Sequence, residues 1–286
     1  MPQQMLNLIT VGDNCLDVYL TKDHMAVGGN ALNVAAQWRL HGYDARYFGV
    51  VGPDDEGRAI LAGLDQAGLP PGDVEIHPGS TAVTLLLERN GDRRFLLEDL
   101  GVGLNYRPDA ARYAALLRAD WVHLGTNTAP DLLRDLIRDG AMFSLDISTV
   151  HDRLPLAGVS LVFASGPEDP AIPVAPLLHA LRERGAVQAV VTCGGRGAFM
   201  LDGAHLVQVP AQKIAVVDTC GAGDSFIAAF LLQHLRGGVS PVEALSAATA
   251  AATRTCLHEG GFPQSLNPIP EWLLHKYADV IASAEG

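Results

Sequence analysis

The sequence predicts an α/β protein with a parallel sheet and a small β lid. Short apolar runs that suit buried strands alternate with segments of helical periodicity, which is typical of parallel strands joined by helices. Two strand-like runs within residues 81–98 interrupt this alternation. Because no repeat, low-complexity tract or long linker divides the chain, we expect residues 1–286 to form a single domain that contains the lid.

The composition excludes several classes of protein. A formal net charge of −12 without any Lys/Arg-rich run argues against a nucleic-acid partner. No apolar run approaches the ~20 residues of a membrane helix, and residues 1–10 lack the features of a signal peptide. The four cysteines and ten histidines show no zinc-ligand or metalloprotease spacing. We therefore expect a cytoplasmic protein with reduced thiols and no tight structural metal.

Polar side chains follow the first predicted strand, residues 6–11. Ligands of open α/β sheets bind outside the carboxyl ends of strands, and short carboxylates and amides suit sugar hydroxyls. The side chains placed to meet a polyhydroxylated ligand are Asp13, Asp17, Asn30 and Asn33. The residues alone equally allow Asp13 and Asp17 to be turn residues and Asn30 to be the N-cap of the helix that follows Gly28-Gly29.

The segment at residues 81–98, which interrupts the alternation, is expected to form a hairpin. Residues 81–88 and 93–97 have strand character and flank Asn90-Gly91, a strong turn signal. Together with strands near residues 18–27, this hairpin is expected to form a lid over the end of the first strand, from about residues 14–29 and 79–104. Closing such a lid would exclude water from a reaction. A plain surface hairpin is the alternative.

The strand and helix alternation surrounds the hairpin on both sides. A strand is expected at 45–51, followed by a helix that carries Ile60, Leu61 and Leu64. Later strands are expected at 121–124, 142–146, 159–164 and 189–192, with helices at 108–117, 131–138 and 174–184. Asp146 ends one of these strands, so it either faces the ligand or caps the next turn.

The most informative stretch is Asp218-Thr219-Cys220-Gly221-Ala222-Gly223-Asp224, which precedes a strongly apolar helix. A helix N-terminus offers unpaired N–H groups, and glycines allow an anion to approach that backbone closely. A carboxylate beside a phosphoryl group would repel it unless the carboxylate faced a hydroxyl that must lose its proton. Asp224 therefore fits the base of a phosphoryl transfer, and a capped helix with a first-turn aspartate is the alternative.

This heptapeptide resembles the C-terminal signature of the PfkB/ribokinase family of carbohydrate kinases. Residues 28–35, with Gly42 and Gly52, resemble its N-terminal signature. The resemblance spans roughly residues 5–265 and implies a ribokinase-like three-layer α/β/α sandwich with a small β-sheet lid. It implies ATP-dependent phosphorylation of a sugar hydroxymethyl group.

The resemblance also assigns roles to residues. Asp224 would be the base, and the amides of Gly221, Ala222 and Gly223 would form the anion hole. The sugar pocket would be lined by Asp17, Gly28, Gly29, Asn30 and Asn33, beside Asp13. The turn at residues 192–197 resembles the family's nucleotide-binding Thr-x-Gly-x-x-Gly, so the nucleotide would contact Thr192, Gly194, Gly197, Glu168, Gly221 and Gly223.

Ion sites and a subunit contact are implied in the same way. Glu168 ends Ser165-Gly166-Pro167-Glu168, where the family usually has Asn-x-x-Glu, a motif that organises Mg²⁺ through water. Serine replaces the asparagine here, so Mg²⁺ organisation would depend more on Glu168 and solvent. Asp218, with the loop around Gly260, resembles the family's K⁺ site. The outer face of the lid would be a homodimer contact.

Within the family, residues 12–17, 28–30 and 221–228 are most similar to fructoselysine 6-kinases, which act on fructose-amine adducts. The acids Asp13, Asp17, Glu98 and Asp99 would suit the protonated amine of such a fructosamine. A fructokinase, ribokinase or nucleoside kinase is the alternative within the family, and a non-catalytic sugar- or nucleotide-binding regulator is the alternative outside it. A nicotinamide dehydrogenase is disfavoured because no Gly-x-Gly-x-x-Gly follows the first strand.

Overall fold

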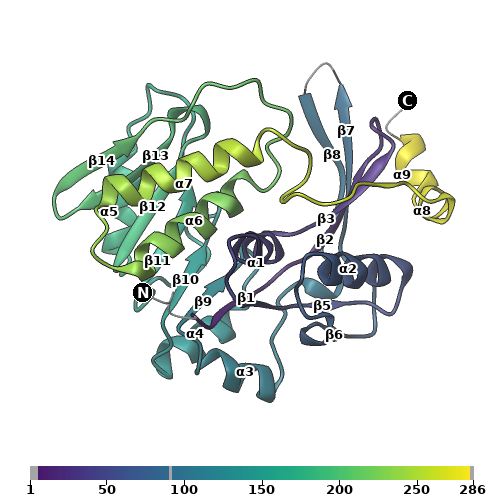
Figure 1. The fold of residues 1–286 in the computed structure, drawn as a ribbon, viewed down its shortest axis with the longest axis horizontal. Helices are drawn as coiled ribbons and strands as arrows, with labels where there is room; N and C mark the ends of the chain where they lie inside the picture. Colours follow the sequence, from purple (N-terminus) through teal and green to yellow (C-terminus); the bar gives the residue numbers. More distant parts are fainter. Residues whose placement is uncertain (1–5, 90–91, 284–286) are drawn as a thin grey trace.

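The structure is a computed structural model that describes residues 6–89 and 92–283. Its main feature is an eight-stranded sheet in the order β14-β13-β12-β11-β10-β9-β1-β4 (Figure 1). The strands are β1 (Leu8–Val11), β4 (Ala45–Phe48), β9 (Trp121–Leu124), β10 (Phe143–Asp146), β11 (Leu161–Ser165), β12 (Gln188–Thr192), β13 (Ala198–Asp202) and β14 (His205–Val209). The six strands from β12 to β4 pair in parallel, whereas β13 and β14 pair antiparallel at one edge.

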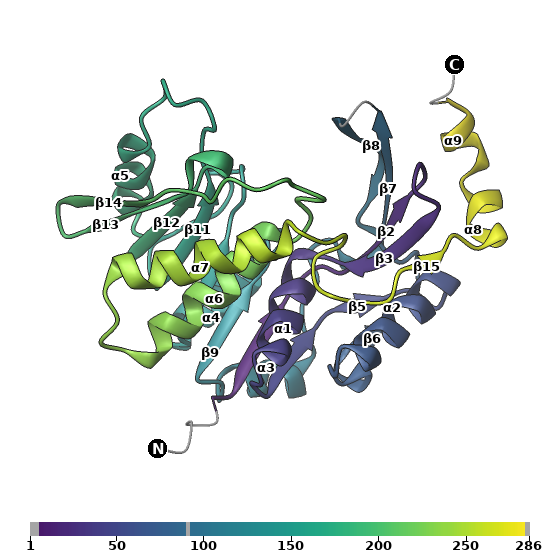
Figure 2. The same ribbon diagram turned by 45° about the horizontal axis from the view of Figure 1, so that its top comes forward.

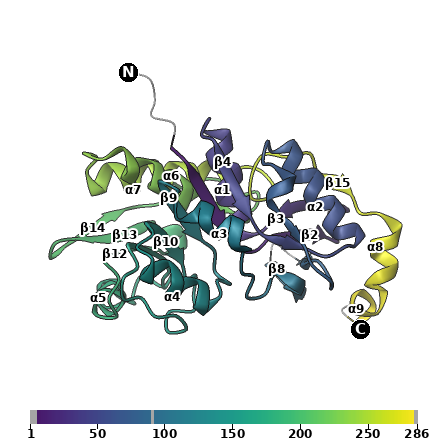
Figure 3. The ribbon, with the colours of Figure 1, turned by 90° about the horizontal axis from the view of Figure 1, so that it is seen from below.

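Helices cover both faces of this sheet, as Figure 3 shows edge-on. One layer contains α1 (Asn30–Leu40), α6 (Ala222–Arg236) and α7 (Pro241–Thr255), and the other contains α3 (Ala110–Leu116), α4 (Pro130–Arg138) and α5 (Ala175–Glu183). Alternate side chains of β1 enter the two layers, because Ile9 and Val11 pack with α3 to α5 whereas Leu8 packs with α1, α6 and α7. The predicted three-layer sandwich is confirmed.

A second, five-stranded sheet stands beside the first (Figure 2). Its order is β15 (Asn267–Pro268), β3 (His24–Gly28), β2 (Cys15–Tyr19), β7 (Val83–Arg89) and β8 (Asp92–Asp99). One face, which includes Leu16, Val18 and Leu85, packs on α1 and on α2 (Asp55–Gln66). The strands expected near residues 18–27, 81–88 and 93–97 are therefore present, and this five-stranded sheet is called the lid below. The predicted turn at Asn90-Gly91 lies outside the described residues.

The predicted strand at 45–51 is divided in the structure. Residues 45–48 form β4, but β5 (Val50–Val51) leaves the large sheet and pairs with β6 (Glu75–Ile76). Gly49 separates the two, and a Cβ at this position would lie 1.9 Å from the Tyr47 hydroxyl oxygen. That hydroxyl donates to the Gly12 carbonyl at 2.9 Å, so Tyr47 fills the space at the bend.

The C-terminal segment forms structure that the sequence did not predict. After β15, α8 (Glu271–Lys276) and α9 (Ala278–Ser283) lie beside the lid (Figure 1). Leu273 is fully buried, and Lys276 Nζ pairs with Glu56 Oε1 of α2 at 2.5 Å. The side chain of Gln264 hydrogen-bonds both the N–H and the carbonyl of Val27, at 2.8 and 2.7 Å. These elements are two to six residues long, too short for a periodic pattern.

Short 3-10 helices complete the fold at Pro71–Asp73, Gly101–Gly103 and Gly194–Arg196. Within residues 6–89 and 92–283, no helix is both long and apolar enough to cross a membrane. The same residues contain no group of three His, Cys, Asp or Glu side chains arranged for a metal ion.

Candidate active site

The candidate site forms where the N-termini of α1 and α6 meet. Asp224 is the third residue of α6 and is only 9% exposed. Its Oδ1 accepts a hydrogen bond from Asn30 Nδ2 at 2.6 Å, and its Oδ2 accepts one from Asn33 Nδ2 at 2.7 Å. Two asparagines of α1 therefore fix both oxygens of one carboxylate of α6.

Asp146, whose role the sequence left open, belongs to this cluster. Its Oδ2 accepts a second hydrogen bond from Asn30 Nδ2, at 2.9 Å, and its Oδ1 accepts one from the Ser148 N–H at 2.8 Å. Asp146 therefore both faces the site and caps the turn after β10. The Asn30 amide is the link between the two carboxylates.

Burial and mutual repulsion control the protonation of these acids. The pKa of Asp224 is raised to about 8, first by burial and also by the charges of Asp146 and Asp13, which together outweigh the lowering effect of the asparagine hydrogen bonds. Burial likewise raises the pKa of Asp146 to about 6. A carboxyl group whose pKa lies near neutrality is suited to take up a proton during a reaction.

Asp13 follows β1 in the sequence, and its side chain lies against the first residues of α1. Its carboxylate accepts hydrogen bonds from the backbone of Asn30 and Ala31, while burial raises its pKa. Its Oδ1 is buried without a hydrogen-bond partner among the described residues. The N-cap position is occupied by Gly29, with φ 112°, so the alternative in which Asn30 is the N-cap is wrong.

Asp17 faces the site from strand β2 of the lid. It is 8% exposed, and its Oδ2 lies 3.8 Å from Cys220 Sγ. A Cβ at Gly28 would lie 2.5 Å from the same Oδ2, so only glycine leaves room for this carboxylate. The predicted sugar-site residues Asp13, Asp17, Gly28, Gly29, Asn30 and Asn33 thus come together around Asp224.

Gly221 to Gly223 form the start of α6. Gly221 is the N-cap with φ 68°, and a Cβ there would lie 2.3 Å from the backbone of Gly261. Both the dihedral angle and the close approach therefore require glycine. A Cβ at Gly223 would meet nothing within 4 Å, so this end of the helix is open to a ligand. The arrangement is suited to an anion at the helix N-terminus.

Asp218 connects this loop to the lid. Its Oδ1 accepts from the Cys220 N–H at 3.0 Å, and its Oδ2 accepts from the Gly260 N–H at 3.1 Å and from the Tyr19 hydroxyl at 2.9 Å. Tyr19 belongs to β2 and was missed by the sequence analysis, since nothing local indicates a partner 199 residues away.

A second set of contacts joins the same two regions. Lys22 and His24, at the tip of the lid, lie 2.8 and 3.2 Å from the carboxylate of Glu259. The lid thus contacts the loops at both residue 218 and residue 259.

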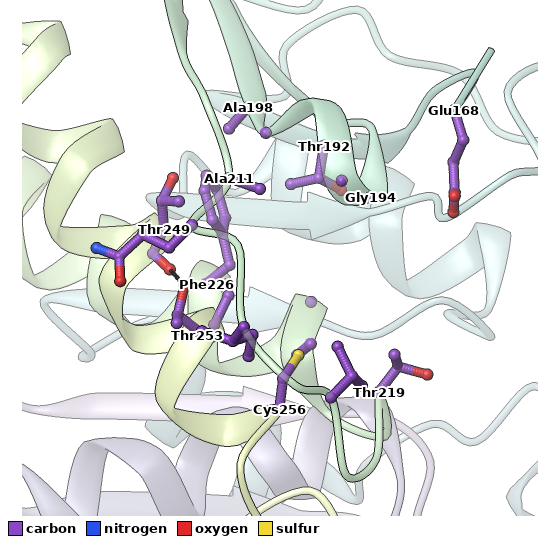
Figure 4. Close-up of a pocket in the computed structure, with 18 residues that line it drawn as sticks. Glu168, Thr192, Gly194, Ala198, Ala211, Thr219, Phe226, Thr249, Thr253 and Cys256 are labelled. Carbon is purple, nitrogen blue, oxygen red and sulfur yellow. Dashed lines mark hydrogen bonds between the residues drawn. The ribbon is translucent and has the colours of Figure 1, made fainter.

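A cavity of about 370 Å³ adjoins the start of α6 (Figure 4). It is lined by the predicted nucleotide residues Glu168, Thr192, Gly194, Gly197 and Gly223, and by Ala222. Figure 4 shows Glu168 at one end of the cavity and Thr249 and Thr253 of α7 at the other. Nothing in the sequence singles out Thr249, Thr253 and Cys256, because an alanine-rich helix such as α7 is typical of close packing.

The loop that carries Glu168 is held against the glycine turn. Arg196 Nη1 donates to the carbonyl oxygens of Pro167, Asp169 and Ile172 at 2.7, 2.8 and 3.0 Å. A Cβ at Gly194 would lie 2.6 Å from the carboxyl carbon of Glu168, so the glycine admits this side chain. A carboxylate at this place fits a magnesium ion held through water.

The side chains of the two lid acids, Glu98 and Asp99, point in different directions. Glu98 pairs in register with Thr84, which neighbours Asp17 across the strands, and its charge raises the pKa of Asp13. Asp99 Oδ1 instead accepts from the Gly101 N–H at 2.9 Å. The expectation that both acids approach the pocket therefore holds for Glu98 and is wrong for Asp99.

Comparison with known proteins agrees with this geometry. A model of the family described as pfkB family carbohydrate kinase matches residues 5–138 and 162–267. A fructoselysine 6-kinase from Shigella flexneri is 33% identical over 90% of this chain and all of its own length. A fructosamine kinase from Bacillus subtilis is 29% identical over 90% of this chain and 93% of its own.

Among solved structures, ribokinase from Arabidopsis thaliana in complex with ribose and ATP superimposes with a TM-score of 0.80. The match covers 95% of this chain and 98% of that one at 21% identity, so it shows a shared fold.

Proposed function

This chain belongs to the pfkB family of carbohydrate kinases, and from that premise we propose that it transfers the γ-phosphoryl group of ATP to a hydroxymethyl group of a fructosamine. The observation that carries the proposal is the Asp224 carboxylate, which two asparagines hold beside the open N-terminus of α6. A base and an anion-binding backbone are thus adjacent, as phosphoryl transfer to an alcohol requires.

In this mechanism Asp224 accepts the hydroxyl proton as the oxygen attacks phosphorus. The N–H groups at Gly221, Ala222 and Gly223 would donate to the phosphoryl oxygens, on which negative charge develops. The Ala222 N–H, which donates to the Thr219 carbonyl oxygen at 3.3 Å in the structure, would exchange that bond for one to the phosphoryl group. Thr192, Gly194 and Gly197 line the cavity for the nucleotide, and Glu168 would hold Mg²⁺ through water. When bound, Mg²⁺ neutralises phosphate charge.

The sugar would lie between the lid and α1, against Asp13, Asp17, Gly28, Gly29, Asn30 and Asn33. Asp17 and Glu98 bring negative charge to this face of the lid, which favours a substrate that carries a protonated amine over a neutral sugar. A fructokinase, ribokinase or nucleoside kinase activity is the alternative within the family. The fixed carboxylate of Asp224 argues against a non-catalytic sugar- or nucleotide-binding regulator.

Three further expectations stay predictions. They are a single kinase domain over residues 1–286, a cytoplasmic location, and a homodimer through the outer face of the lid. Because α8 and α9 lie beside the lid, a partner subunit would contact these helices or displace them (Figure 1).

We predict that Asp224→Asn lowers kcat by roughly 10²–10⁴-fold, because the amide preserves shape but cannot accept the proton. Kd values for ATP and for the sugar should change less than about tenfold, since neither ligand needs that proton to bind. Asp146→Asn is the matched control, because it removes a neighbouring charge but leaves the base. It should lower kcat less than Asp224→Asn does. Steady-state kinetics and calorimetry decide the matter, and near-wild-type turnover of Asp224→Asn would remove Asp224 from the mechanism.

We also predict a higher kcat/KM for fructoselysine than for fructose. Glu98→Gln should narrow this ratio about two- to fivefold, as an exposed charge interaction is worth up to ~1 kcal/mol. Asp99→Asn is the matched control, since Asp99 points into a turn, and it should leave the ratio unchanged. Equal effects of both variants would contradict the charge argument, and a wild-type preference for fructose would contradict the substrate assignment.

A third prediction concerns K⁺, which we propose to bind near Asp218 and the loop around Gly260. Replacement of K⁺ by tetramethylammonium should lower activity, because the bulky cation cannot contact carboxylate and carbonyl oxygens at close range. Activity assays in matched chloride salts test this expectation. Equal rates in the two salts would show that no such site supports catalysis.

A further inference from the structure

A second cavity, of about 140 Å³, lies among α1, α6 and α7 and shares no lining residue with the nucleotide cavity. It is lined by His41, Tyr43, Ala229, Leu232, Gln233, Arg236, Ala247 and Arg254. Three of these residues carry basic groups, and they come from three different helices or their ends. The fold thus brings basic side chains together in a chain whose net charge is −12.

Neither arginine of this cavity is neutralised by a neighbour. Within residues 6–89 and 92–283, the guanidinium groups of Arg236 and Arg254 form no ion pair or hydrogen bond, unlike many arginines of this chain. Those that pair with an aspartate include Arg39, Arg46, Arg58, Arg107, Arg112, Arg134 and Arg138. Two unpaired guanidinium groups at one cavity are therefore unusual for this protein.

The two arginines affect the pKa of the neighbouring His41. The pKa of His41 is lowered, first by burial and then by the positive charges of Arg254 and Arg236. Both guanidinium groups are therefore close enough to repel a proton on the imidazole. An anion in the cavity would relieve that repulsion.

Helix dipoles explain only part of this arrangement. Arg236 lies in the last turn of α6 and Arg254 in the last turn of α7, where a cation interacts favourably with the helix end. That effect accounts for each arginine separately. It does not require the two arginines to line one cavity together with His41 and the amide of Gln233.

We propose that this cavity is a second anion site, which binds a phosphate group, either inorganic phosphate or a phosphomonoester. Arginine forks match phosphate oxygens, and Gln233 can add a neutral N–H donor. The volume is less than half that of the nucleotide cavity, so it suits one phosphate group with a small substituent and not a nucleotide. This assignment does not depend on the identity of the sugar.

The test is titration of inorganic phosphate into the full-length protein with its nucleotide cavity saturated by Mg²⁺ and a non-hydrolysable ATP analogue. Isothermal calorimetry follows binding, and the NMR signals of the His41 imidazole report it independently. We expect the wild type to bind phosphate and the double variant Arg236→Gln, Arg254→Gln to bind at least about tenfold more weakly, since it loses two charge-assisted partners.

Arg118→Gln is the matched control, because Arg118 is an exposed arginine whose side chain has no partner among the described residues and lies outside this cavity. It should leave the affinity unchanged. Parallel titrations with fructose 6-phosphate and with fructose show whether the cavity binds a phosphomonoester as well as free phosphate. Fructose, which carries no charge, should not shift the NMR signals of His41. Equal phosphate affinity in the wild type and the double variant, or no shift of the His41 signals by phosphate, would overturn the proposal.

Discussion

The site depends on the pair of hydrogen bonds that joins Asn30 and Asn33 of α1 to the carboxylate of Asp224 on α6. Helix α1 follows β3 in the first part of the chain and α6 lies in its last quarter, so these bonds connect residues more than 190 positions apart. They fix both oxygens of the carboxylate at the helix N-terminus where a phosphoryl group would bind. Loss of either asparagine would leave a buried carboxylate with one oxygen unsupported.

The same cluster has an energetic cost. Because burial raises the pKa of Asp224 to about 8, the folded protein holds a proton that the unfolded chain releases near the ordinary aspartate pKa. The free energy of unfolding that this group contributes therefore falls as the pH rises from about 4 to about 8. The negative charges of Asp146 and Asp13 lie nearby and raise the pKa of Asp224 as well. The site therefore lowers the stability of the folded protein near neutral pH and in return holds a carboxylate with a raised pKa.

Much of the fold could be predicted because its signals are local. The apolar run at residues 121–124 predicted β9 with its observed bounds, Trp121–Leu124, and the glycines before Asp224 indicated where α6 begins. The residues missed by sequence analysis are those whose meaning depends on distant partners. Tyr19 becomes informative only beside Asp218, and Thr249 and Thr253 only where α7 lines the nucleotide cavity. The short C-terminal helices likewise depend on side chains supplied by other segments, and the bend at Gly49 depends on the Tyr47 hydroxyl, whose partner is the distant Gly12 carbonyl.

The most direct test of the central claim is the pH dependence of kcat/KM for the sugar between about pH 6 and pH 9. The account predicts that kcat/KM rises with pH as one group loses a proton, with a plateau above the pKa of about 8 that burial gives Asp224. Only the deprotonated carboxylate, held by Asn30 and Asn33, can accept the hydroxyl proton. A profile that is flat over this range, or that falls as the pH rises through it, would contradict the assignment of Asp224 as the base.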